Sequence, residues 1–208
     1  EDTQSTQKLK EEAASRVGPK IRPLANAKED AVMAAREVFA AAEDIRQTTD
    51  RGEDFEPVSV LQDQLSWELS PQTLRALLEM PPEALEETVQ VTTNLVSTQM
   101  SEVIRDSGDS LREAREEIAQ QASELELDPS QKLVCRQIAQ AVIRPNHVYD
   151  PELTQEARQQ ARQSVTPVER NIQAGEVVIL AGEEVTTRHL DIFRALGMIN
   201  PAIDYAQA

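Results

Sequence analysis

The sequence predicts a mainly α-helical fold, a helical bundle with a small β hairpin or sheet element near the C-terminus. Apolar residues make up 39% of the 208 residues, aromatic residues only 3% and charged residues 28%, which is typical of a helix-rich chain exposed to water. Apolar positions recur at helical spacings of three and four, and Ser-Pro or Asp-Pro pairs precede several of these stretches. A chain of this length can bury a genuine core.

The helices are predicted in order from periodicity and from start and stop signals. Leu9, Ala13 and Val17 lie on one helix face, and Pro19 ends that helix. A Ser or Asp N-cap followed by Pro stands at residues 70–71, 128–129 and 150–151, and each pair predicts a helix start. The predicted helices cover residues 5–17, 27–46, 59–67, 82–103, 111–125, 131–143 and 151–165. A further helix begins at residue 71, and a loop is predicted at 51–57.

The last fifty residues differ in character. Val177–Leu180 is apolar and β-branched, and two Ala-Gly-Glu triplets at 174–176 and 181–183 flank it. Glycine at these points favours tight turns, so we expect short strands here. A final helix is predicted from Thr187 to Leu196, with Gly197 as the residue that ends it.

A weak internal repeat relates the two ends of the chain. Identical residues recur at an offset of 148, among them Thr6 and Thr154, Ala13 and Ala161, and Val17 and Val165. Such matches also arise by coincidence between helices rich in Ala, Gln and Glu. A genuine repeat would give each end a helix terminated by Val-x-Pro, and two such helices are suited to pack side by side.

Negative charge is concentrated in the middle of the chain. There are 21 Lys and Arg against 37 Asp and Glu, a net charge of −16, and residues 37–128 alone carry 6 basic and 22 acidic side chains. This balance argues against a nucleic-acid partner, because phosphates need a basic face. The charge divides the chain, expected to be one structural domain, into near-neutral ends, residues 1–36 and 129–208, and an acidic helical part, residues 37–128. One interpretation is that the two ends form a membrane-proximal part and the acidic part avoids the membrane surface. The alternative is that the acidic stretch is a set of water-exposed helix faces.

No catalytic or metal-binding pattern emerges. Cys135 lies among apolar residues and is expected to be a buried structural thiol. His147 lies in a loop where Asn146 and Asp150 are expected to serve as turn and cap residues. His189 and Asp191 point to different faces of one helix and cannot form a metal pair or an acid–base dyad. We therefore assign no catalytic, metal-binding or cofactor-binding residue and expect no cofactor.

The C-terminal third carries an ordered series of motifs. It begins with Pro-Asn-His-Val-Tyr-Asp at 145–150 and continues through Thr154, Arg158, Ala161, Val165, Pro167, Ile172, Gly175-Glu176, Gly182-Glu183, Val185-Thr186 and Leu196-Gly197. This series resembles the extracellular domain of seven-transmembrane receptors with an intracellular HD hydrolase domain. The stretch from Thr6 to Pro19 is similar to the segment after the first membrane helix of that family, although Ile21 stands where a tyrosine is expected.

The resemblance implies a non-enzymatic extracellular sensor at the extracytoplasmic face of a bacterial plasma membrane. One membrane helix would precede it and several would follow, leading to a cytoplasmic HD phosphohydrolase whose relatives hydrolyse cyclic di-AMP. The implied partners are an unknown extracellular ligand or protein and the flanking membrane helices of the same chain, and a homodimer is compatible with this arrangement. Ligand binding would shift the helices at the two ends relative to each other.

Two other function classes compete with the sensor. The first is an acidic helical adaptor that binds a protein or the cell envelope and senses no small molecule. An exposed apolar groove without a concave pocket would favour the adaptor. The second is an enzyme in its own right, which would require a pocket that gathers carboxylates from distant segments.

Overall fold

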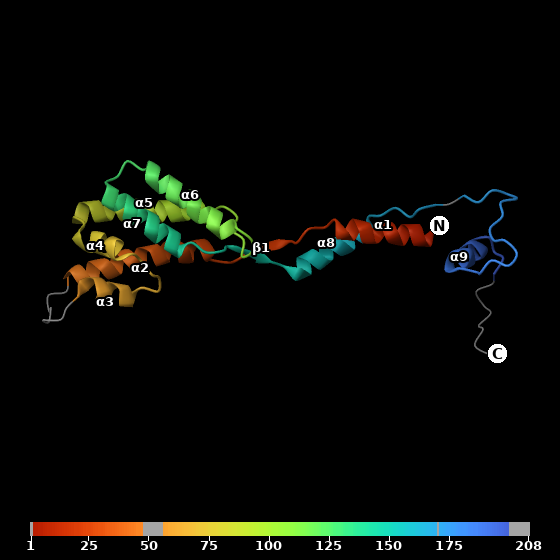
Figure 1. Ribbon diagram of the computed structural model, residues 1–208, viewed down its shortest axis with the longest axis horizontal. Helices are drawn as coiled ribbons and strands as arrows, with labels where there is room; N and C mark the ends of the chain where they lie inside the picture. The colour runs from red at the N-terminus through yellow and green to blue at the C-terminus, as the bar shows by residue number, and fades with distance from the viewer. Residues whose placement is uncertain (1, 48–55, 170, 200–208) are drawn as a thin grey trace. The chain divides into compact units, whose positions relative to one another are not determined.

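The computed structural model describes residues 2–47, 56–169 and 171–199, and the chain divides into two compact units (Figure 1). The terminal unit consists of residues 1–20 and 150–208, and the central unit of residues 21–149. The chain passes between them twice, at 20–21 and at 149–150. These units are defined by compactness, whereas the predicted parts at residues 1–36, 37–128 and 129–208 are defined by charge. The predicted loop at 51–57 lies almost entirely outside the described residues.

The described part of the terminal unit contains three helices. Their bounds are α1 Thr3–Ser15, α8 Pro151–Gln163 and α9 Thr187–Ala195. Both α1 and α8 begin at an aspartate N-cap, since Asp2 and Asp150 accept hydrogen bonds at 3.0 and 2.9 Å from the amides of Ser5 and Leu153. The predicted helices at 5–17, 151–165 and 187–196 are therefore confirmed to within two residues at each end.

The central unit is a helical bundle with one small sheet. Its elements are β1 Ile21–Pro23, α2 Ala27–Gln47, α3 Pro57–Gln64, α4 Pro71–Glu79, α5 Pro82–Gln99, α6 Ser110–Glu124, α7 Pro129–Val142 and β2 His147–Tyr149. Pro occupies the first turn of α3, α4, α5 and α7, where its missing N–H leaves no bond unmade. A mainly α fold with a minor β element is confirmed.

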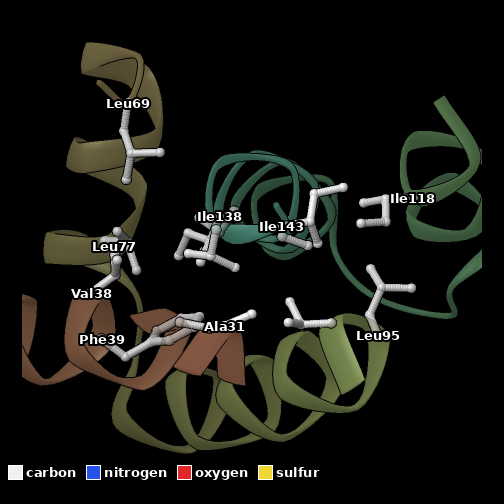
Figure 2. Packing of buried hydrophobic residues seen from close by; sticks show 14 of the residues in the cluster. Ala31, Val38, Phe39, Leu69, Leu77, Leu95, Ile118, Ile138 and Ile143 are labelled. Carbon is white, nitrogen blue, oxygen red and sulfur yellow. The ribbon is translucent and has the colours of Figure 1, made fainter. Parts of the chain in front are cut away.

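Helix α7 lies at the centre of this bundle because it packs against α2, α4, α5 and α6. Val134, Ile138 and Ala139 on α7 are fully buried. Figure 2 shows Ile138 among the side chains that fill the space between these helices, including Val38 of α2 and Leu77 of α4. The described residues of the terminal unit contribute nothing to this core.

The β element forms in a different place from the one predicted. Residues 177–180 form no strand, whereas β1 and β2 pair antiparallel with Ile21 opposite Tyr149. The two Ala-Gly-Glu triplets do form turns, in which Gly175 and Gly182 have φ near +90°, a conformation that glycine adopts without a steric cost. A β-branched run between turns forms strands only where a second segment pairs with it, and the described residues offer none here.

Candidate functional site

Helices α1 and α8 form an antiparallel pair that joins residues remote in the sequence. At one end, the backbone N–H of Lys20 donates to the Thr154 hydroxyl at 2.9 Å, and the carbonyl of Lys20 accepts from the amide of Asp150 at 2.9 Å. The segment that leaves α1 therefore docks onto the first turn of α8. This contact gives the N-cap amide of Asp150 the acceptor that the start of a helix does not itself provide.

The other end of the pair repeats this arrangement in the opposite direction. The N–H of Val168 donates to the Thr6 hydroxyl at 2.9 Å, and its carbonyl accepts from the amide of Asp2 at 2.7 Å. Val168, Thr6 and Asp2 lie 148 positions from Lys20, Thr154 and Asp150, respectively. The offset indicated by the sequence thus corresponds to a two-fold relation within the terminal unit, which confirms the predicted packing of the two repeat helices.

One ion pair breaks the symmetry of the helix pair. Arg162 contacts Glu11 at 3.2 Å, whereas the positions 148 residues away are Ala14 and Gln159, which cannot form an ion pair. Both partners are at least one-third exposed, so the contact contributes little to stability.

A hollow of about 860 Å³ lies within the terminal unit, between the first turn of α1 and helix α9. This volume is within the usual range for small-molecule sites. Apolar side chains line part of it, namely Ile172, Ile192 and Leu196. The first turns of both helices contribute to the lining, and helix N-termini present backbone donors.

Two acidic side chains that line the hollow have partners within the terminal unit. Glu183 accepts a hydrogen bond from the amide of Leu180 at 3.2 Å, and Asp191 pairs with Arg194 at 3.1 Å. The amide of Thr186 donates to Nδ1 of His189 at 3.3 Å, which places the ring proton of the neutral tautomer on Nε2. His189 thus presents a donor, and the hollow suits a small molecule with an apolar part and an acceptor group.

His147 and Asn146 have a structural role in the central unit. The Asn146 side chain, 6% exposed, accepts from the amide of Ile104 at 2.8 Å and donates to the carbonyls of Met100 and Glu102 at 2.9 and 2.7 Å. Its own Oδ1 lies 2.8 Å from Nδ1 of His147. The loop after α5 is therefore held against β2, and α5 ends at Gln99 rather than at residue 103 as the apolar stripe had predicted.

Cys135 is fully buried, as expected. The Thr92 hydroxyl donates to its sulfur at 3.2 Å. Burial raises the pKa of the Cys135 thiol above its ordinary value, and the Thr92 hydrogen bond opposes this shift. A thiol of this kind is a poor nucleophile because the reactive thiolate is disfavoured.

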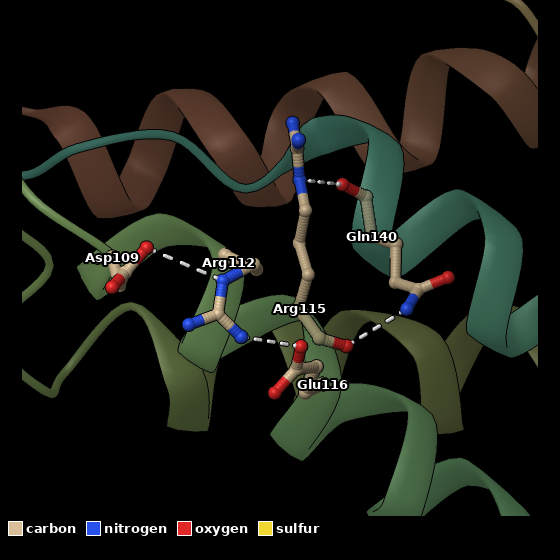
Figure 3. A network of polar contacts seen from close by, with 5 residues as sticks. All are labelled: Asp109, Arg112, Arg115, Glu116 and Gln140. Carbon is tan, nitrogen blue, oxygen red and sulfur yellow. Dashed lines mark hydrogen bonds and ion pairs between the residues drawn. The ribbon is translucent and has the colours of Figure 1, made fainter.

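The negative charge of the central unit is spread over its helix surfaces. Figure 3 shows Arg112 of α6 between Asp109 and Glu116, to which it is joined at 3.3 and 2.7 Å. Arg115 and Gln140 exchange two hydrogen bonds between α6 and α7 at 3.1 and 2.8 Å. Within the described ranges, no group of three or more His, Cys, Asp or Glu side chains is arranged to hold a metal ion.

The comparison with known families is decisive for identity, because the model of the 7TM-HD extracellular family matches residues 1–200. The chain belongs to this family. The match includes the acidic middle, which carries no motif recognisable from the sequence alone. No curated protein and no solved structure matches the chain.

Membership of the 7TM-HD extracellular family identifies the chain as an extracellular sensory domain of a 7TM-HD membrane protein, located outside the cytoplasm. Among the described helices, none has the length and apolar character needed to cross a lipid bilayer. Within the terminal unit, the hydrogen bonds between segments remote in the sequence are concentrated at the two ends of the α1–α8 pair. Sequence reasoning found them through the 148-residue offset, whereas no sequence signal marked the hollow beside α9.

Proposed function

We propose that this domain senses an extracellular small molecule or protein and relays the signal to a cytoplasmic HD-family hydrolase in the same protein, acting on a cyclic dinucleotide such as cyclic di-AMP. The domain itself is not the enzyme in this proposal. The observation that carries it is the pairing of α1 and α8, which unites residues 1–20 with residues 150–169. A disturbance of that pair therefore affects residues 1–20 and residues 150–169 together, although residues 21–149 separate them in the sequence.

The hollow beside α9 supports a small-molecule ligand. It has a suitable volume, an apolar wall and helix N-termini that offer hydrogen-bond donors. For such a ligand to act as a signal, it must bind one arrangement of the domain more tightly than another. Flanking membrane helices would then adopt the arrangement that the ligand favours.

The contribution of the central unit to the relay is tested by removing this unit from the full-length protein. Because the amide of Asp150 already bonds to the carbonyl of Lys20, a Gly-Gly linker between these residues can replace residues 21–149 and leave the helix pair in place. The rate of cyclic di-AMP hydrolysis is then compared in proteoliposomes for the intact and the shortened protein. We expect the hydrolysis rates of the two proteins to differ roughly fivefold or more, because the coupling free energy between two sites is typically ~1–3 kcal/mol.

Equal rates would show that the central unit takes no part in the relay and would confine sensing to the terminal unit, where the hollow lies, provided that crosslinking or exchange data show an intact α1–α8 pair. A full-length protein with Met33→Ala serves as the control, because Met33 is 54% exposed on the surface of α2. That variant should hydrolyse the substrate at the unaltered rate. A complete lack of hydrolysis by the intact protein would reject the proposed substrate and leave the relay to be measured with other cyclic dinucleotides.

A protein-binding adaptor is the second candidate function. Its supporting observation is the exposure of large apolar side chains in the C-terminal part of the terminal unit, where Val177, Leu180 and Met198 are each about two-thirds exposed. Exposed apolar groups of this kind favour association with another protein. An adaptor requires no coupling to the hydrolase, so a changed hydrolysis rate after the excision favours the relay over the adaptor.

A further inference from the structure

The two ends of the α1–α8 pair are fastened by equivalent hydrogen-bonded contacts, which we call clasps. Each clasp consists of a threonine hydroxyl, an aspartate N-cap amide, and one residue that bonds to both through its backbone. The first clasp is Lys20 with Asp150 and Thr154, and the second is Val168 with Asp2 and Thr6.

We propose that the two clasps lock the register of α1 against α8, so that the pair moves as one rigid body and does not slide. The inference goes beyond the proposed function, because it concerns how the pair moves and requires no particular ligand or hydrolase substrate. It also differs from a relay in which the two helices shift relative to each other.

The geometry of the clasps opposes sliding in both directions. They lie at opposite ends of a 13-residue helix, about 20 Å apart at 1.5 Å per residue. Displacing α1 along α8 in either direction moves both clasp residues away from their threonines. A shift of one helical turn, about 5.4 Å, breaks all four hydrogen bonds. Thr6 and Thr154 are each 2% exposed, so water does not readily replace the lost partners.

The remainder of the interface does little to fix the register. Among the residues of α1 and α8, only Thr6, Ala14 and Thr154 are buried. These buried residues are small, so they do not form the large knobs and holes that hold packed helices in one alignment. The polar clasps must therefore supply the alignment that apolar packing supplies in the central unit.

The clasp contacts define which residues face each other. Lys20 meets Thr154 and Thr6 meets Val168, so in this antiparallel pair facing residues have numbers that add up to about 174. Ala13 is thus opposite Ala161, whereas Ala157 lies one turn away along α8. These alanines allow a disulfide test of the register.

The test uses the full-length protein in membranes, with cysteine pairs introduced and oxidised. We expect the Ala13→Cys, Ala161→Cys pair to crosslink at least tenfold faster than the Ala13→Cys, Ala157→Cys pair. Single-cysteine variants control for reaction with the buried Cys135. Comparable rates for both pairs would show that the helices slide, and absence of the first crosslink would show that the register is different. Either result overturns the proposal.

A second set of variants tests whether the clasps cause the lock. Thr6→Val with Thr154→Val preserves the shape of both side chains and removes both hydroxyl acceptors. In this background the one-turn-shifted pair should crosslink several-fold faster, and Thr6→Ser with Thr154→Ser should restore the original preference. Thr3→Val, which alters an exposed threonine of α1, should have no effect. An unaltered preference in the double valine variant would refute the role of the clasps.

Discussion

Thr6 and Thr154 stand 148 residues apart and make the same hydrogen bond in opposite directions across the α1–α8 pair. Each hydroxyl accepts at 2.9 Å from the backbone N–H of the residue that follows the partner helix's Val-x-Pro. Their equivalence shows that residues 2–20 and residues 150–168 are two copies of one structural unit. A substitution in one copy should therefore have the same effect as the equivalent substitution in the other copy.

The aspartate N-caps provide a direct test of this equivalence. Asp2→Ala and Asp150→Ala each remove a side-chain acceptor from the first turn of α1 or α8. We expect each variant to lower the free energy of unfolding by about 1 kcal/mol, the usual cost of losing an N-cap. Urea titration followed by circular dichroism measures the change, with exposed Glu152→Ala as the control. A large loss for one aspartate and none for the other would contradict the two-fold relation.

Asn146 is expected to be the most sensitive polar residue of the central unit. Asn146→Ala would leave the amide of Ile104 and the carbonyls of Met100 and Glu102 without their partner. Because these groups lie in a largely buried contact, we expect a loss of roughly 2–4 kcal/mol in the free energy of unfolding. Asn94→Ala is the matched control, since Asn94 is exposed on α5. Equal effects of the two substitutions in urea titration would show that the contact is unimportant.

The sequence was informative wherever structure depends on neighbouring residues. Ser70 before Pro71 and Asp150 before Pro151 marked the starts of α4 and α8, because capping and a proline in the first turn act within a few residues. The 148-residue offset additionally indicated a long-range contact, since both copies carry the threonine that the partner segment needs. The starts of these helices and the α1–α8 pair could therefore be predicted.

Contacts that depend on distant segments could not be predicted in the same way. Strand β2 at His147–Tyr149 exists because it pairs with β1, and three residues are too few for an alternating pattern. Val103 continues the apolar stripe of α5, yet it lies outside the helix and is 49% exposed. Asn146, more than forty residues further along the chain, holds the segment after α5 in a non-helical path. The hollow beside α9 likewise depends on tertiary placement, so its lining residues carry no local signal.

The central position of α7 predicts a large penalty for truncating its core residues. Ile138→Ala removes three carbon atoms from a fully buried side chain, which costs both transfer free energy and the energy of the resulting cavity. The free energy of unfolding should fall by about 2–5 kcal/mol. Met33→Ala, at an exposed position of α2, should alter it by less than ~0.5 kcal/mol. A small effect at Ile138 in urea titration would contradict its placement in the core.

Cys135 makes the stability of the central unit dependent on pH above neutrality. Burial raises the pKa of its thiol in the folded state, whereas the unfolded thiol titrates near ~8.5. Between these two pKa values the unfolded chain loses its proton first, so the thiol's contribution is fully present below the unfolded pKa and is lost as pH rises toward the folded pKa. The free energy of unfolding should fall by up to ~1.4 kcal/mol per pH unit in this window. Urea titrations from pH 7 to pH 10 measure this slope. The free energy of unfolding of Cys135→Ala should depend less steeply on pH by that amount, although the variant is less stable at pH 7. Parallel pH profiles for the two proteins would show that the thiol ionises equally readily in the folded and unfolded chains.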